Sequence, residues 1–166
     1  MITIAIANQK GGCGKTTTAV NLSACLAEAG YKALLLDLDP QAHTTLGLGV
    51  HPETLQQNIY DALVSRNITL TNLMLDTDIP RLYLIPASLI LSGAQVELLS
   101  ATDREFRLRN RLADLPESFE FVIIDCPPSL NILTINALTA ATDVLIPIQS
   151  HYYSLEGMKE LMGTIE

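Results

Sequence analysis

The sequence predicts an α/β fold with three layers, in which a mainly parallel sheet lies between helices. Short runs rich in Ile, Val and Leu alternate along the chain with stretches that have helical periodicity. The runs are almost continuously apolar, which is typical of strands that are buried on both faces. Because such strands alternate with helices, the pattern indicates βαβ units and therefore parallel pairing.

The individual elements follow from these runs. Strands are expected at residues 2–7, 33–37, 82–85, 121–125 and 144–148. Helices are expected at residues 15–29, 59–65, 89–99, 103–115, 131–141 and 154–166, with a break near 100–102. Gly30 should cap the first helix, since glycine adopts the left-handed conformation without a Cβ penalty. The apolar face of this helix should carry Val20, Ala24 and Ala27.

Length and composition limit the class of protein. The chain has 166 residues, 48% of them hydrophobic, which suits a single domain over residues 1–166. Its net charge of −8 argues against nucleic-acid binding as the main role of this chain alone. No run of about 20 apolar residues is present, so no membrane span is expected. The expected last helix ends without a cap, which suggests a chain truncated at its C-terminus.

Three cysteines are present, Cys13, Cys25 and Cys126. An odd number at wide spacing predicts neither a disulfide framework nor a zinc site, and it suits the reducing cytoplasm. The apolar N-terminus has no basic segment before it and is interpreted as a first strand, not a signal peptide. We therefore expect a cytoplasmic protein.

The strongest motif is Gln-Lys-Gly-Gly-Cys-Gly-Lys-Thr-Thr at residues 9–17, between an expected strand and an expected helix. This is the context of a P-loop, in which glycines turn the backbone so that its N–H groups surround phosphate. The helix N-terminus adds positive potential, and Lys15 a full charge. The predicted ATP-binding residues are Lys10, Gly11, Gly12, Cys13, Gly14, Lys15, Thr16 and Thr17.

Carboxylates follow two further apolar strands. Asp37 and Asp39 come at the end of one strand, and an extended backbone would aim both the same way. Asp125 ends a second strand, before Pro127 and Pro128, in the Walker B arrangement. Ligands of open α/β sheets bind outside the carboxyl ends of the strands, so these groups predict a magnesium site beside the P-loop.

Together these motifs resemble the ParA/MinD family of deviant Walker A ATPases, and most closely its ParA/Soj chromosome- and plasmid-partition branch. The resemblance covers essentially the whole chain. The segments that carry it are residues 8–12, 36–41, 124–130, 146–149 and 152–157. The sequence departs from the family pattern in two places. His151 stands where the family often has Glu. The family also has further elements after this point, which carry adenine-pocket and DNA-binding residues.

The resemblance implies ATP and Mg²⁺ as cofactors and assigns roles to the matched residues. Lys10 would reach across an ATP-dependent homodimer to the partner's phosphates, beside the P-loop lysine Lys15. Asp39 would position the hydrolytic water. The residues that would hold or approach the metal are Thr16, Asp37 and Asp125. A ParB-like partner would stimulate turnover, while DNA binding is not expected of this acidic chain without the family's further elements.

Other interpretations stay open. A non-hydrolysing nucleotide sensor that acts as an interaction module is one alternative, and a MinD-like positioning ATPase at a membrane surface is another. An iron–sulfur reductase is disfavoured, because Cys126 is its one suitable cysteine. The basic residues Arg104, Arg107, Arg109 and Arg111 predict a salt-bridged surface helix, with a phosphate-binding patch as the alternative.

Overall fold

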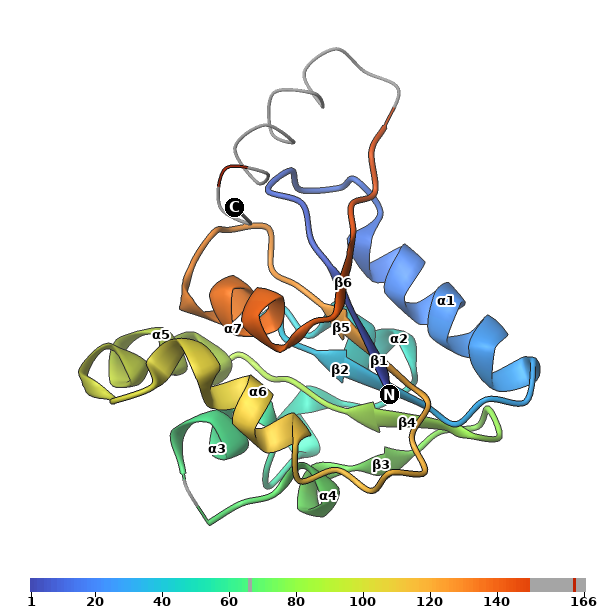
Figure 1. Ribbon diagram of the computed structural model, residues 1–166, viewed down its shortest axis with the longest axis horizontal. Coiled ribbons are helices and arrows are strands. Elements are labelled where there is room, and N and C mark those ends of the chain that lie inside the picture. Colours follow the sequence, from blue (N-terminus) through green and yellow to red (C-terminus); the bar gives the residue numbers. More distant parts are fainter. Residues whose placement is uncertain (66, 150–162, 164–166) are drawn as a thin grey trace.

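The computed structural model describes residues 1–65, 67–149 and 163. Within them the strands form one six-stranded sheet in the order β3-β4-β2-β5-β1-β6 (Figure 1). All neighbouring strands pair in parallel except β3 and β4. The strands are β1 Ile2–Ile6, β2 Ala33–Asp37, β3 Leu75–Asp76, β4 Leu82–Ile85, β5 Phe121–Asp125 and β6 Asp143–Leu145.

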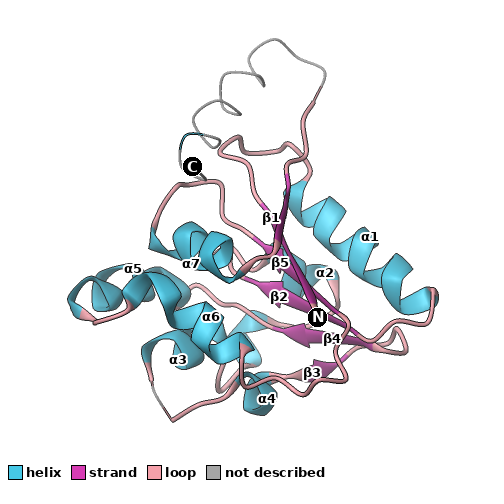
Figure 2. Ribbon diagram, in the orientation of Figure 1, coloured by secondary structure: helices cyan, strands magenta, loops and turns pink. Residues whose placement is uncertain are grey.

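Helices cover both faces of this sheet (Figure 2). They are α1 Lys15–Glu28, α2 His43–Gly47, α3 Ile59–Val64, α4 Leu70–Leu73, α5 Leu91–Glu97, α6 Arg107–Leu112 and α7 Ile132–Ala140. Short 3₁₀ turns occupy Pro52–Thr54, Leu98–Ser100 and Arg104–Phe106. Helix α1 covers one face, while α3, α5, α6 and α7 lie on the other (Figure 1). The predicted three-layer α/β fold is therefore confirmed.

Strand β2 shows why the sheet needs both layers. All five of its residues are buried. Leu34 and Leu36 belong to the core beneath α3, α5 and α7, whereas Leu35 belongs to the core beneath α1. Successive side chains of a strand point to opposite faces, so a continuous leucine run is stable only when both faces are covered.

The observed strands match three predictions in full, at 33–37, 82–85 and 121–125. The last strand is displaced to Asp143–Leu145, and Pro147 beyond it has no N–H for a sheet ladder. The structure adds α2, α4 and the two-residue strand β3. The expected helix at 154–166 lies outside the described residues. In the part of the chain that is described, the structure contains no helix long and apolar enough to cross a membrane.

Helix α1 ends as predicted, and its buried face agrees with the predicted one only in part. Gly30 has φ +99°, and the Tyr31 N–H donates to the Leu26 carbonyl at 3.1 Å, which closes the helix end. Ala27 is buried as predicted, and Val20 is half-buried against the same core. The fully buried stripe continues through Ala19 and Ser23, which were not predicted, while Ala24 is half-buried. Small residues let the helix approach the sheet closely, and the Ser23 hydroxyl is satisfied by the Ala19 carbonyl at 2.8 Å.

Candidate nucleotide-binding site

Three adjacent strands bring the predicted motifs to one edge of the sheet. Strand β5 lies between β1 and β2, and Asp125 is in register with Ile6 on one side and Asp37 on the other. The segment that follows β1 is the glycine-rich loop, so the loop and both aspartates meet at the carboxyl ends of the strands. The parallel pairing of the sheet therefore assembles the site.

The glycine-rich loop depends on left-handed backbone conformations. Gly12 has φ +70° and Gly14, the N-cap of α1, has φ +93°. An added Cβ at either position would meet no atom within 4 Å, so conformation rather than space requires glycine there. Lys15 is buried, and its Nζ donates to the Lys10 carbonyl at 3.2 Å, which places its charge inside the loop.

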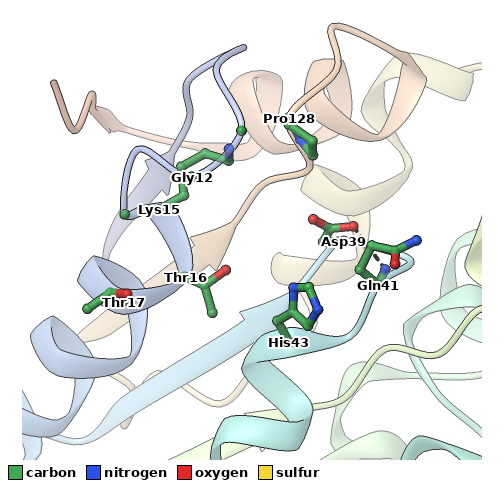
Figure 3. A pocket seen from close by; sticks show the side chains of 10 residues that line it. Gly12, Lys15, Thr16, Thr17, Asp39, Gln41, His43 and Pro128 are labelled. Atoms are coloured by element: carbon green, nitrogen blue, oxygen red, sulfur yellow. Dashed lines mark hydrogen bonds between the residues drawn. The ribbon is translucent and has the colours of Figure 1, made fainter. Parts of the chain in front are cut away.

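A cavity of about 420 Å³ opens between this loop and the segment after β2. Figure 3 shows Lys15 and Thr16 on one side and Asp39, Gln41 and His43 on the other. The lining residues are Gly11, Gly12, Gly14, Lys15, Thr16, Thr17, Asp39, Gln41, His43 and Pro128. The cavity has the size of a small-ligand site.

Not every predicted nucleotide residue faces this cavity. Cys13 is buried and does not line it, and Lys10 does not line it either. Gln41 and His43 were not predicted as site residues, and His43 begins α2. They follow Asp39 by two and four residues, and Gln41 also lies in the segment 36–41 that carried the family resemblance.

Asp125 is buried behind the cavity lining, where one of its carboxylate oxygens is hydrogen-bonded and the other is not. Its Oδ2 accepts hydrogen bonds from the hydroxyls of Thr16, at 2.8 Å, and Thr44, at 2.7 Å. Its Oδ1 is buried and has no hydrogen-bond partner among the described residues. Burial raises the pKa of this carboxyl, while the two hydroxyls and the charge of Lys15 act in the opposite direction.

Asp37 has a different environment from Asp39. Its Oδ2 accepts from the Thr45 N–H at 2.9 Å and the Thr45 hydroxyl at 2.7 Å, and its Oδ1 accepts from the Asp39 N–H at 3.1 Å. Burial raises its pKa to about 7. The chain leaves the extended conformation after Asp37, so the two carboxylates do not point the same way: Asp37 supports the turn, and Asp39 lines the cavity.

The residues present fit a magnesium ion bound together with phosphate. The unpartnered Asp125 Oδ1 and the hydroxyl of Thr16 provide oxygen ligands next to the lysine. No group of three or more His, Cys, Asp or Glu side chains that could hold a metal occurs in the described part of the chain. Mg²⁺ typically binds through one or two protein oxygens and takes its other ligands from phosphate and water, so the two oxygens named above suffice on the protein side.

The Lys10 side chain extends toward Gln149, in the segment that follows β6. Its Nζ donates to Gln149 Oε1 at 3.3 Å, and Gln149 Nε2 donates to the Gly12 carbonyl at 2.9 Å. Asn8 supports the same arrangement, since its Oδ1 accepts from the Lys10 N–H at 3.0 Å. Asn8 and Gln149 fall in segments that carried the family resemblance, but neither was predicted to have a role.

Replacing Thr45 by Val tests the support of the carboxylate side of the cavity. The Thr45 hydroxyl donates to Asp37 and accepts from the Ala87 N–H at 2.9 Å, so T45V leaves two buried polar groups without this partner. We expect the free energy of unfolding to fall by about 3 kcal/mol, measured by urea denaturation. The exposed Thr54 also carries a hydrogen-bonded hydroxyl, and T54V should cost less than about 0.5 kcal/mol. Equal effects would contradict this role.

Comparisons with known proteins agree with this geometry. The family model for the AAA domain matches residues 1–166. The chain is 48% identical over 162 residues to the sporulation initiation inhibitor protein Soj of Bacillus subtilis, covering 98% of this chain and 64% of Soj. The chain thus spans less than two thirds of the length of this relative.

Two solved structures are similar in fold and sequence. Cobyrinic acid a,c-diamide synthase from Mycobacterium smegmatis, with bound ADP and magnesium, has a TM-score of 0.95 and 41% identity, over 99% of this chain and 66% of that chain. A putative plasmid partition protein from Borrelia burgdorferi bound to AMPPNP has a TM-score of 0.86 and 30% identity, over 99% and 67%. Both were solved with an adenine nucleotide or its analogue.

Proposed function

Because the chain belongs to the AAA domain family, in the branch of the Soj and ParA partition proteins, we propose that it is an ATP-binding and ATP-hydrolysing switch. Its cellular role would be DNA or plasmid segregation, or the positioning of another cargo. The observation that carries the proposal is the cavity between the glycine-rich loop with Lys15 and the wall that contains Asp39 (Figure 3). This arrangement can hold a nucleotide's phosphates opposite a carboxylate.

Binding is assigned to the loop and the start of α1. The backbone N–H groups of Gly11–Lys15 and the Lys15 ammonium would hold the phosphates. Thr16 and Asp125 would hold Mg²⁺, with Asp37 near it behind the turn. The ion, when bound, neutralises charge on the phosphate oxygens. The adenine nucleotides and magnesium of the similar solved structures support this choice of ligands.

Hydrolysis is assigned to Asp39 and Lys10. Asp39 Oδ1 accepts from the Gln41 N–H at 2.9 Å, which fixes the carboxylate on the cavity wall and leaves Oδ2 to orient a water molecule. Lys10 would act on the phosphates of a second copy in an ATP-dependent homodimer, where its charge stabilises the transition state. We expect slow, Mg²⁺-dependent turnover that a ParB-like partner protein stimulates.

We propose that this dimer acts in the cytoplasm. The net charge of −8 argues against nonspecific DNA binding, and hence nucleoid association, by these 166 residues alone. Light scattering without nucleotide, with ADP and with ATP, each in the presence and absence of DNA, would measure dimerisation and DNA binding together.

Replacing Lys15 by Gln is expected to weaken ATP binding by roughly 100-fold, because charge-assisted hydrogen bonds to phosphate are lost. Calorimetry with ATP and ADP measures the affinity, and phosphate release measures turnover. Lys32→Gln is the matched control, since Lys32 packs over Tyr83 and Phe119 far along the sheet from the loop. Tight ATP binding without phosphate release by the parent chain would contradict an ATPase and support a nucleotide sensor.

A further inference from the structure

A second cavity, of about 320 Å³, lies along α6 and shares no lining residue with the nucleotide cavity. It is lined by Asp103, Arg107, Asn110 and Arg111. We propose that this cavity is an anion-binding site that receives the phosphate or carboxylate group of a small ligand. Its volume is at the lower end of the range for small-molecule sites.

Arg107 lines the cavity and carries an unsatisfied buried donor. Its Nε is buried and has no hydrogen-bond partner among the described residues. In the same part of the chain, the one arginine that forms an ion pair is Arg104, with Glu105 at 2.6 Å. The expected ion pairing is therefore found at Arg104 and not at the two arginines that line the cavity. A buried donor on a charged group without a partner is unfavourable, and Arg107 lines the cavity, so a small shift of its side chain would let Nε donate to an oxyanion bound there.

Arg111 provides a second guanidinium that is already held in place. Its Nε donates to the Ala62 carbonyl at 2.9 Å, and its Nη2 donates to the Ser65 carbonyl. These neutral acceptors fix the side chain against the end of α3 but do not cancel its charge. A side chain that is ordered before binding loses less conformational entropy when the ligand arrives.

The spacing of the two arginines allows both to contact the same ligand. Arg107 and Arg111 are four residues apart, on the same face of α6, and the Asn110 amide adds a neutral donor beside them. Asp103 is the one acidic lining residue and forms no ion pair with either arginine. The cavity thus carries two positive charges and one negative charge on a chain whose net charge is −8. The net positive charge of the cavity lining favours the binding of anions.

The test follows the Nε–Hε resonance of Arg107 and the side-chain amide of Asn110 by NMR, in the full chain saturated with ADP and Mg²⁺ so that the nucleotide cavity is filled. Inorganic phosphate is titrated in one arm and malonate in the other, at constant ionic strength with chloride. We expect both resonances to shift and saturate with at least one anion. Whether phosphate or malonate binds more tightly identifies the preferred oxyanion.

Arg107→Gln should raise the anion concentration that half-saturates the Asn110 shift at least tenfold, and Arg107→Lys should restore part of the affinity. Arg109→Gln is the matched control, because Arg109 is exposed on the same helix and does not line the cavity. The proposal is overturned if neither resonance shifts with either anion. It is also overturned if R107Q and R109Q raise the half-saturating anion concentration equally.

Discussion

Lys10→Ala is expected to lower ATP turnover at least about 100-fold and to change ATP affinity less than about threefold, because a positive charge supplied from a partner acts mainly in the transition state. The geometry within one chain supports a larger effect on turnover than on ATP affinity. Lys15 lines the cavity, whereas Lys10 Nζ contacts Gln149 and lies outside the lining. Phosphate release at saturating ATP gives the turnover, and calorimetry gives the affinity.

A mixture of two inactive variants tests whether Lys10 acts across the dimer. Asp39→Ala should also lose hydrolysis while still binding ATP. In a heterodimer of K10A and D39A, the site on the K10A chain retains its own Asp39 and receives Lys10 from its partner. Random pairing makes half the dimers heterodimers with one active site each, so about one quarter of the parent turnover should return. No recovery, although both variants dimerise with ATP, would contradict action in trans.

The sequence predicts the strands that are buried on both faces and misses the elements held by tertiary contacts. Strands β2, β4 and β5 are continuous apolar runs, and their bounds agree with the structure. Strand β3 has two residues at the edge of the sheet, too few for any periodicity. Helix α2 has the weak helix-forming sequence His-Thr-Thr-Leu-Gly, and the hydroxyls of Thr44 and Thr45 anchor it to buried aspartates.

The candidate site, too, could be predicted from the sequence only in part. The glycine-rich loop could be predicted because its residues are contiguous and each has a physical reason to be there. The difference between Asp37 and Asp39 could not, because it depends on where the backbone turns and on Thr45, eight residues later. Gln149 was missed as a contact of Lys10 because the two are 139 residues apart in the sequence.

The stability of the nucleotide-free chain is expected to fall as the pH rises from 5 to 7. Burial raises the pKa of Asp37 from 3.8 to about 7, so between these values the folded chain binds a proton that the unfolded chain does not. That contribution to stability is complete below pH 4 and is lost as the pH passes 7, at up to about 1.4 kcal/mol per pH unit. The pKa of Asp125 is raised as well, which acts in the same direction.

Asp37→Asn should remove most of this dependence, since Asn has nearly the shape of the protonated acid and does not titrate. Urea denaturation at pH 5, 6, 7 and 8, without nucleotide or Mg²⁺, gives the free energy of unfolding. Between pH 5 and 7 the parent should lose roughly 2–3 kcal/mol more than D37N. Asp114→Asn, at an exposed carboxylate, is the matched control and should keep the parent's slope. Parallel pH profiles for D37N and the parent would show that Asp37 is charged when the chain folds, in spite of its burial.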